Sequence, residues 1–114
     1  MNPPAGGAHL PTPANPGFYK GNDVPPDGAL VHAEEHGFVI LWFKSGLSAE
    51  KMQQISDLSD QFGRELIVVE RPSLTDDVAV TAWHRRALCA SLDPSKVEIF
   101  TRAYKDQGPE KGFL

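Results

Sequence analysis

The fold is decided by the stretch Phe38-Val-Ile-Leu-Trp-Phe43, which is continuously apolar and rich in β-branched and aromatic residues. Short apolar runs of this composition are typical of strands that are buried on both faces. The stretch is also the longest apolar run in the chain, and it is far too short to span a bilayer. We therefore expect a central strand of a sheet here.

The segments that follow this strand have clear helix and strand signals. Ser48 is placed to cap a helix that runs to Phe62, and Gly63 is placed to end it. Along that helix, Met52, Ile55, Leu58 and Phe62 fall on one face. The remaining signals predict two strands and a last helix, at Leu66–Val69, at Val78–Trp83 and from Asp93-Pro94 to Gly108-Pro109.

The N-terminal residues 1–28 are rich in proline and glycine, which excludes a regular helix or a central strand. Because Leu10, Phe18 and Tyr19 give this arm apolar anchors, we expect it to pack on a single domain formed by residues 29–114. A short helix is expected to begin at Asp27, as its N-cap, and to end at Gly37.

Together these elements predict the α+β class. We expect a mostly antiparallel sheet of three or more strands, two main helices on one face, and the proline-rich N-terminal arm.

Length, composition and charge limit the function. The chain has 114 residues, 40% of them hydrophobic, and a formal net charge of −4. This size allows one core that is stable without disulfides or a structural metal. The acidic balance argues against a nucleic-acid partner and an anionic membrane surface. The lone Cys89 excludes an internal disulfide, and we expect it to be a small core residue rather than a ligand.

Two of the four histidines are spaced for chemistry, in His32-Ala-Glu-Glu-His36. Residues four apart on a helix lie on one face, so both imidazoles could reach one metal ion, whereas on a strand they would be too far apart. The pattern also fits H-x-x-E-H, in which two histidines bind zinc and Glu35 activates water. A helix of barely two turns is poor support for such a hydrolase.

Other residues could complete a metal site. An arm folded back over the short helix would bring His9 close as a third nitrogen ligand, and Glu35 could serve as a fourth ligand or as a partner of a ligand. Such a set suits zinc or copper. His84, which follows Trp83 at a strand end, is more often a surface or hydrogen-bonded residue than a ligand.

Several segments are similar to the bacterial DUF3105 domain family. They are Leu30-Val31-His32-Ala33-Glu34-Glu35-His36-Gly37, the Gly-x-His around His9, Phe18-Tyr19, Thr81-Ala82-Trp83, and Phe100 to Glu110 ending in Gly-Pro-Glu. The resemblance covers nearly the whole chain, and its pattern matches His9, His32, Glu35 and His36. The sequence departs from the family pattern at Glu34 and at His84. At Glu34 an apolar residue is usual, so we expect more of the short helix to be exposed. At His84 glycine is typical.

The resemblance implies an extracytoplasmic location, because members of the family are usually carried outside the cytoplasm behind an N-terminal membrane anchor. The residues Met1 to Gly7 show neither the basic nor the apolar region of a signal peptide. We therefore expect either a chain whose export segment is missing or a cytoplasmic variant.

Three functions follow as hypotheses. The first is a small accessory domain that binds copper or zinc through the histidine cluster without catalysis. The second is an interaction or structural subunit of a larger assembly, in which the histidines satisfy one another and the arm or a sheet edge meets a partner. The third, and weakest, is a metal-dependent hydrolase with Glu35 as general base.

Overall fold

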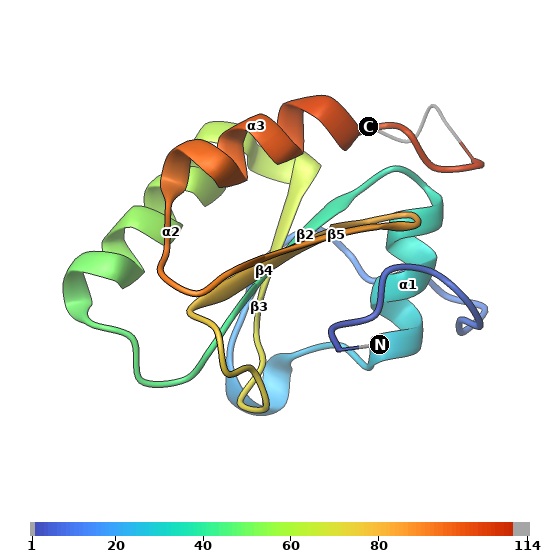
Figure 1. Cartoon of the computed structure of the whole chain (residues 1–114). Coiled ribbons are helices and arrows are strands. Elements are labelled where there is room, and N and C mark those ends of the chain that lie inside the picture. The colour runs from blue at the N-terminus through green and yellow to red at the C-terminus, as the bar shows by residue number, and fades with distance from the viewer. Residues whose placement is uncertain (1, 111–114) are drawn as a thin grey trace.

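The computed structural model describes residues 2–110 and places a five-stranded sheet between two layers (Figure 1). The strands are β1 (Phe18–Tyr19), β2 (Val39–Phe43), β3 (Leu66–Glu70), β4 (Val78–Ala82) and β5 (Arg85–Cys89). The helices are α1 (Asp27–Glu35), α2 (Ala49–Phe62) and α3 (Pro94–Tyr104), with 3-10 turns at Gly21–Asp23 and Gly63–Glu65. The predicted α+β class is confirmed.

The sheet is mixed, which corrects the expectation of a mostly antiparallel one. Its strand order is β1-β3-β2-β4-β5. β1 and β2 both run parallel to β3, whereas β4 is antiparallel to β2 and to β5. The parallel pairing of β2 with β3 follows from α2, because a helix between two strands returns the chain to the same end of the sheet. β2 is central, as its apolar run predicts.

Two strands lie outside the predicted set. β1 is a two-residue strand inside the proline-rich arm, and it pairs with β3 at Val68 and Val69. β5 begins with Arg85 and Arg86 and is mostly exposed, so it lacks the apolar pattern of a strand. Neither strand carries a strong sequence signal, because β1 has only two residues and β5 contributes only the small residues Ala87 and Cys89 to the core.

The two faces of the sheet are covered differently (Figure 1). α2 and α3 pack on one face, as expected for the two main helices, and α1 lies on the opposite face together with the arm. The first core holds the buried residues between the sheet and α2 and α3, among them Leu41, Ile55, Leu58, Val80, Val97 and Phe100. The second core lies under α1 and includes Leu30, Ala33, Ile40, Trp42 and Val69.

Local capping explains where α2 and α3 begin and end. The Ser48 hydroxyl accepts a hydrogen bond from the Lys51 amide at 3.2 Å, and Gly63 ends α2 at a φ of +56°. The Asp93 carboxylate likewise accepts from the Ser95 amide at 3.1 Å. α3 ends at Tyr104, earlier than the predicted stop at Gly108, because the backbone of Lys105 is extended, with φ −60° and ψ 144°, and Asp106 follows with a φ of +56°.

The arm is bound to the start of α1 by backbone hydrogen bonds. The Leu10 amide donates to the Gly28 carbonyl at 3.1 Å, and the Ala14 amide donates to the Ala29 carbonyl at 2.9 Å. Asp27 is the first residue of α1 rather than its cap, and its carboxylate binds the Arg71 guanidinium at 2.7 and 3.1 Å. These contacts bring the arm alongside the helix that carries the histidine pair.

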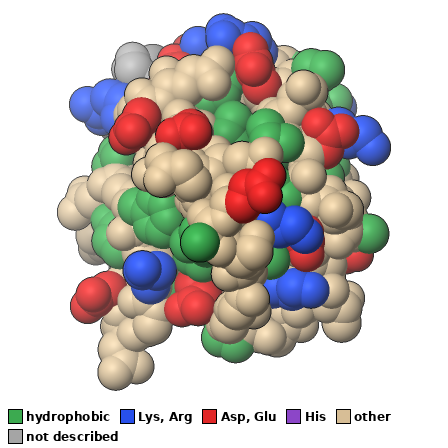
Figure 2. All heavy atoms as spheres, turned by 90° about the vertical axis from the view of Figure 1, so that its left-hand side faces the viewer, with side chains coloured by type: hydrophobic (Ala, Val, Ile, Leu, Met, Phe, Trp, Pro, Cys, Tyr) green, Lys and Arg blue, Asp and Glu red, His purple; other side chains and the backbone are tan. Residues whose placement is uncertain are grey.

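The face that carries α2 has a mixed surface. Acidic and basic side chains lie among apolar ones on it, and none of the four histidines is visible there (Figure 2). No helix in residues 2–110 is long and apolar enough to cross a membrane.

Candidate metal centre

α1 places His32 and His36 on one side of the helix, as their spacing predicts. His32 lies in the last turn and His36 is the C-cap residue, whose amide donates to the His32 carbonyl at 3.3 Å. The two imidazole rings stack with their centroids 4.7 Å apart. Gly37 ends the helix at a φ of +98°, the left-handed stop that the sequence indicates.

Glu110 joins the histidine pair from the other end of the chain. Its Oε2 lies 2.8 Å from Nδ1 of His36. His32, His36 and Glu110 each offer one ligand atom, and these three atoms all lie within 4.8 Å of one another. Two nitrogens and a carboxylate oxygen at this separation form a candidate metal centre.

The segment after α3 is folded back onto α1 and carries Glu110 to this position (Figure 1). The Asp106 amide donates to the Gly37 carbonyl at 2.7 Å, and the Glu110 amide donates to the Glu35 carbonyl at 3.0 Å. Gly108 lies so close to α1 that a Cβ there would be 2.2 Å from the Glu35 carbonyl oxygen. The close approach therefore requires glycine at position 108.

Glu110 was not among the predicted ligands, although the segment that contains it supports the family resemblance. No local spacing links it to His36, since the two are joined only through the folded chain. The one sequence feature that could have pointed to Glu110 as a ligand is Gly108-Pro109-Glu110, in which a glycine that allows close packing comes two residues before an acidic side chain.

His9 lies beside the cluster, because the arm is folded over α1. Its ring centroid is 4.5 Å from that of His32, and its Nε2 is 3.0 Å from the Glu35 Oε2. The structure therefore brings His9, His32, His36 and Glu35 into one neighbourhood, but it groups His9 with Glu35 and the other two with Glu110. A ligand role for His9 or Glu35 remains a prediction.

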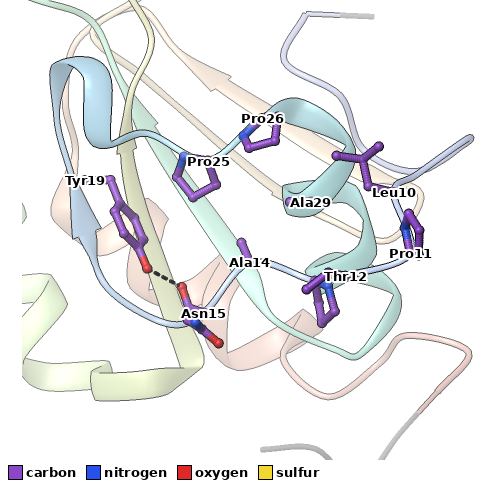
Figure 3. Close-up of a pocket in the computed structure, with 10 residues that line it drawn as sticks. Leu10, Pro11, Thr12, Ala14, Asn15, Tyr19, Pro25, Pro26 and Ala29 are labelled. Atoms are coloured by element: carbon purple, nitrogen blue, oxygen red, sulfur yellow. Dashed lines mark hydrogen bonds between the residues drawn. The ribbon is translucent and has the colours of Figure 1, made fainter.

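The arm also orients His32. Nδ1 of His32 is 2.7 Å from the Leu10 carbonyl oxygen, which can only accept, so Nδ1 carries a proton and, in the neutral imidazole, Nε2 has the lone pair. Next to this contact, the arm and the start of α1 enclose a groove of about 410 Å³ (Figure 3). Leu10 and Ala29 line the groove, and Tyr19 spans its other end with a hydrogen bond to the Asn15 carbonyl at 2.8 Å.

Glu34 lies on the opposite side of α1, against the sheet. It is fully buried and accepts a hydrogen bond from Thr81 of β4, whose hydroxyl in turn accepts from the Trp42 indole at 2.7 Å. Burial raises the pKa of the Glu34 carboxyl to about 8, against the opposing effect of the hydrogen bonds from Thr81 and the Gly6 backbone. The expectation of greater exposure at Glu34 is wrong, because the helix directs this position inward.

The other two residues considered lie elsewhere. His84 is in the turn between β4 and β5, where its ring stacks on Trp83 at 4.7 Å and its amide donates to the Ala5 carbonyl at 2.9 Å. Cys89 is buried in the core beneath α2 and α3, and burial raises the pKa of its thiol. Its place in the core agrees with the structural role expected for it.

The fold and the site define a small α+β domain with a histidine and glutamate cluster of metal-binding composition. The chain belongs to the family described as "protein of unknown function (DUF3105)", which matches residues 1–113. Comparison with curated proteins and with solved structures gave no match.

Proposed function

We propose that this domain is an accessory, non-catalytic metal-binding domain in which His32, His36 and Glu110 hold one transition-metal ion. The observation that carries the proposal is the convergence of the three ligand atoms within 4.8 Å. A metal bound there would join α1 to the C-terminal segment. An extracytoplasmic location, as the family resemblance implies, forms part of the proposal.

The hydrogen bond at His32 supports a ligand role. Histidines that bind metals usually donate their second ring N–H to a carbonyl or a carboxylate, which fixes the ring and its tautomer. The Leu10 carbonyl meets this requirement at 2.7 Å and leaves Nε2 of His32 available for the metal. The arm therefore orients the ligand even if His9 does not bind the ion itself.

The donor set favours zinc or cupric copper. Imidazole and carboxylate ligands suit both ions, whereas cuprous copper prefers the soft sulfur ligands that this group does not contain. For a site of fixed composition, affinity rises toward copper in the divalent series. We therefore expect tighter binding of Cu²⁺ than of Zn²⁺.

The contacts of Glu35 favour a binding role over hydrolysis. In the H-x-x-E-H motif this residue would be the general base that activates a metal-bound water. Here its carboxylate is paired with His9 at 3.0 Å, and the carboxylate that joins the histidine pair belongs to Glu110. A base engaged by another side chain is poorly placed to accept a proton from water.

The test is elemental analysis of the protein purified without added metal or chelator, followed by calorimetric titration of the chelator-treated protein with Zn²⁺ and Cu²⁺. We expect about one equivalent, with binding lost in the double variant His32→Ala/His36→Ala and weakened in Glu110→Gln. Removal of a residue that hydrogen-bonds a metal ligand commonly costs roughly 10- to 100-fold in affinity, and loss of the ligand Glu110 should cost at least as much. Binding should also weaken as the pH falls, because protons compete for the imidazole nitrogens.

Matched controls separate the site from nonspecific binding. His84→Ala removes a histidine that lies outside the cluster, and Glu98→Gln removes a half-buried carboxylate of α3 that pairs with Arg102. Both should bind as the parent protein does. Circular dichroism must show that the double variant remains folded. A folded double variant that still binds one equivalent would overturn the proposal.

A further inference from the structure

β5 forms one edge of the sheet and is only partly shielded. It pairs with β4 on one side, and no other strand within residues 2–110 lies on its outer side. Arg85, Arg86 and Leu88 are exposed, Leu88 by 50%. A free edge of this length presents unpaired backbone N–H and C=O groups that can pair with a further strand.

Arg85 and Arg86 lie on opposite faces of the sheet at this edge. The Arg85 guanidinium lies 5.6 Å from the centre of the Tyr104 ring of α3 and donates to the His84 carbonyl at 3.1 Å. The Arg86 guanidinium donates to the Asn2 carbonyl of the arm at 3.2 Å. Successive strand residues point to opposite faces, so the edge is flanked by one arginine on each side.

Neither of these arginines is neutralised by an acidic side chain. Within the described part of the chain, carboxylates pair with lysines and arginines elsewhere, among them Lys44, Lys51, Arg71, Arg102 and Lys105, but with neither Arg85 nor Arg86. Arg85 and Arg86 thus place two adjacent positive charges without carboxylate partners on a chain whose net charge is −4. Their guanidinium groups keep donors for a carboxylate from outside.

There is open space beside the arginines on both faces. One cavity of about 430 Å³ is lined by Ala5, His84, Arg85 and Arg86. A second, of about 330 Å³, borders Arg85 together with Trp83 and Tyr104. Side chains of an added strand could therefore reach each guanidinium.

We propose that β5 is a docking edge for an extended segment of another protein, with two adjacent acidic residues opposite Arg85 and Arg86. Such a segment would add a sixth strand through backbone hydrogen bonds, the mode known as β-augmentation. Adjacent acidic residues point to opposite faces, so each meets one arginine. An apolar residue further along the segment would cover Leu88. The same arginines disfavour basic segments, which makes the edge selective.

The experiment uses the whole chain and a synthetic peptide. The probe is an acetylated and amidated peptide of about ten residues, in which valine and threonine alternate around two adjacent glutamates. The reference peptide has two lysines in place of the glutamates. With ¹⁵N-labelled protein, we expect the glutamate peptide to shift the amide resonances of β5 most and to slow their hydrogen exchange, and we expect the lysine peptide to do neither.

Charge reversal provides the decisive variant. Arg85→Glu/Arg86→Glu should weaken binding of the glutamate peptide about tenfold or more and should now bind the lysine peptide. Lys20→Glu/Arg64→Glu makes the same change in net charge at exposed positions near β1, the opposite edge of the sheet, and should leave the affinity for the glutamate peptide within about twofold of the parent.

Three results would overturn the proposal. The glutamate peptide could fail to shift the β5 amides of the folded protein, or its affinity could fall equally in both double variants, which would indicate net charge alone. The third is a concentration-dependent dimer that forms without peptide and is lost in the β5 variant. That result would make a second copy of this chain the occupant of the edge.

Discussion

The two faces of the sheet are built from the same strands but bury different chemistry. Beneath α2 and α3, the core contains apolar side chains drawn from β2, β3, β4 and both helices. Beneath α1, the apolar core adjoins the chain of hydrogen bonds from Trp42 through Thr81 to the fully buried Glu34, and the histidine cluster lies on the far side of the same helix. The apolar core beneath α2 and α3 can therefore stabilise the fold, while the face beneath α1 contains polar groups that are costly to bury.

The largest effect should come from Glu34, on the face under α1. Its folded pKa of about 8 lies above the ordinary value of 4.5, so the folded protein holds this proton more tightly than the unfolded chain does. The resulting stabilisation is complete below about pH 4.5 and is lost as the pH rises through about 8. We expect the free energy of unfolding to fall by several kcal/mol over this range, with an upper limit of about 5 kcal/mol.

Urea denaturation of chelator-treated protein at a series of pH values measures this dependence. Glu34→Gln should flatten this pH dependence, because the amide cannot titrate, whereas Glu98→Gln, on the side of α3 away from the core, should retain the full dependence. If the parent protein and Glu34→Gln lose stability in parallel between pH 5 and 8, Glu34 is not the group responsible.

The second prediction concerns the apolar face. Ile55 of α2 is fully buried, so Ile55→Ala should lower the free energy of unfolding by about 3 kcal/mol through lost burial and the cavity left behind. Ile99→Ala is the matched control, because Ile99 of α3 is 68% exposed, and it should change stability by less than about 0.5 kcal/mol.

Measuring the metal stoichiometry of Ile55→Ala tests whether the two faces are independent. The folded fraction of Ile55→Ala should bind metal as the parent protein does, because Ile55 lies in the core on the other side of the sheet from α1. A variant that stays folded but loses its metal would show that the two faces are coupled.

The third prediction concerns Asp77, a buried charge at the edge of the apolar face. Its carboxylate binds Nζ of Lys51 at 2.6 Å and accepts from the Leu92 amide at 2.9 Å, while Nζ of Lys44 lies 3.5 Å away. The hydrogen bond from Lys51, followed by that from Leu92, lowers the pKa of the Asp77 carboxyl. This contribution is present above the ordinary pKa of 3.8 and is lost as the pH falls below it.

Asp77→Asn should therefore cost about 2 kcal/mol at pH 7, because it leaves the buried contacts of Asp77 only partly satisfied. At pH 3 the difference from the parent protein should shrink. Chemical denaturation of the parent protein and Asp77→Asn at pH 7 and pH 3 measures the loss of stability at each pH. Asp60→Asn, at an exposed position of α2, is the matched control and should show neither effect. A loss of equal size at pH 3 and pH 7 would mean that the charge of Asp77 is not what stabilises the fold.

The apolar face could be predicted from sequence, because its signals are local. The run in β2, the helical spacing of Ile55, Leu58 and Phe62, and the caps at Ser48 and Asp93 each lie within a few residues of the structure they determine. By contrast, β5 is fixed by its pairing with β4 and not by its own composition, since it begins with two exposed arginines.

On the other face, only the local part of the site could be predicted. His32 and His36 are four residues apart on one helix, so their proximity follows from helical geometry. Glu110 reaches His36 only because Gly108 allows the returning segment to touch α1. Glu34 lies between the two histidines in sequence, yet it faces Thr81 on a strand that no spacing rule connects to it. Contacts of this kind come from tertiary packing.

The smallest predicted effect lies at the turn between β4 and β5, where His84 adopts a φ of +61°. Left-handed backbone strains a residue with a Cβ by about 1 kcal/mol, and glycine avoids the strain at some cost in chain entropy. His84→Gly should therefore raise the melting temperature by about 2 to 4 °C.

His84→Ala separates backbone strain from the ring contact, because it removes the stacking on Trp83 but keeps the Cβ. It should leave the melting temperature unchanged or slightly lower, as measured by calorimetry alongside His84→Gly. If both variants melt below the parent protein, the stacking of His84 on Trp83 outweighs the strain of its backbone. The histidine would then stabilise the turn that leads into the β5 edge.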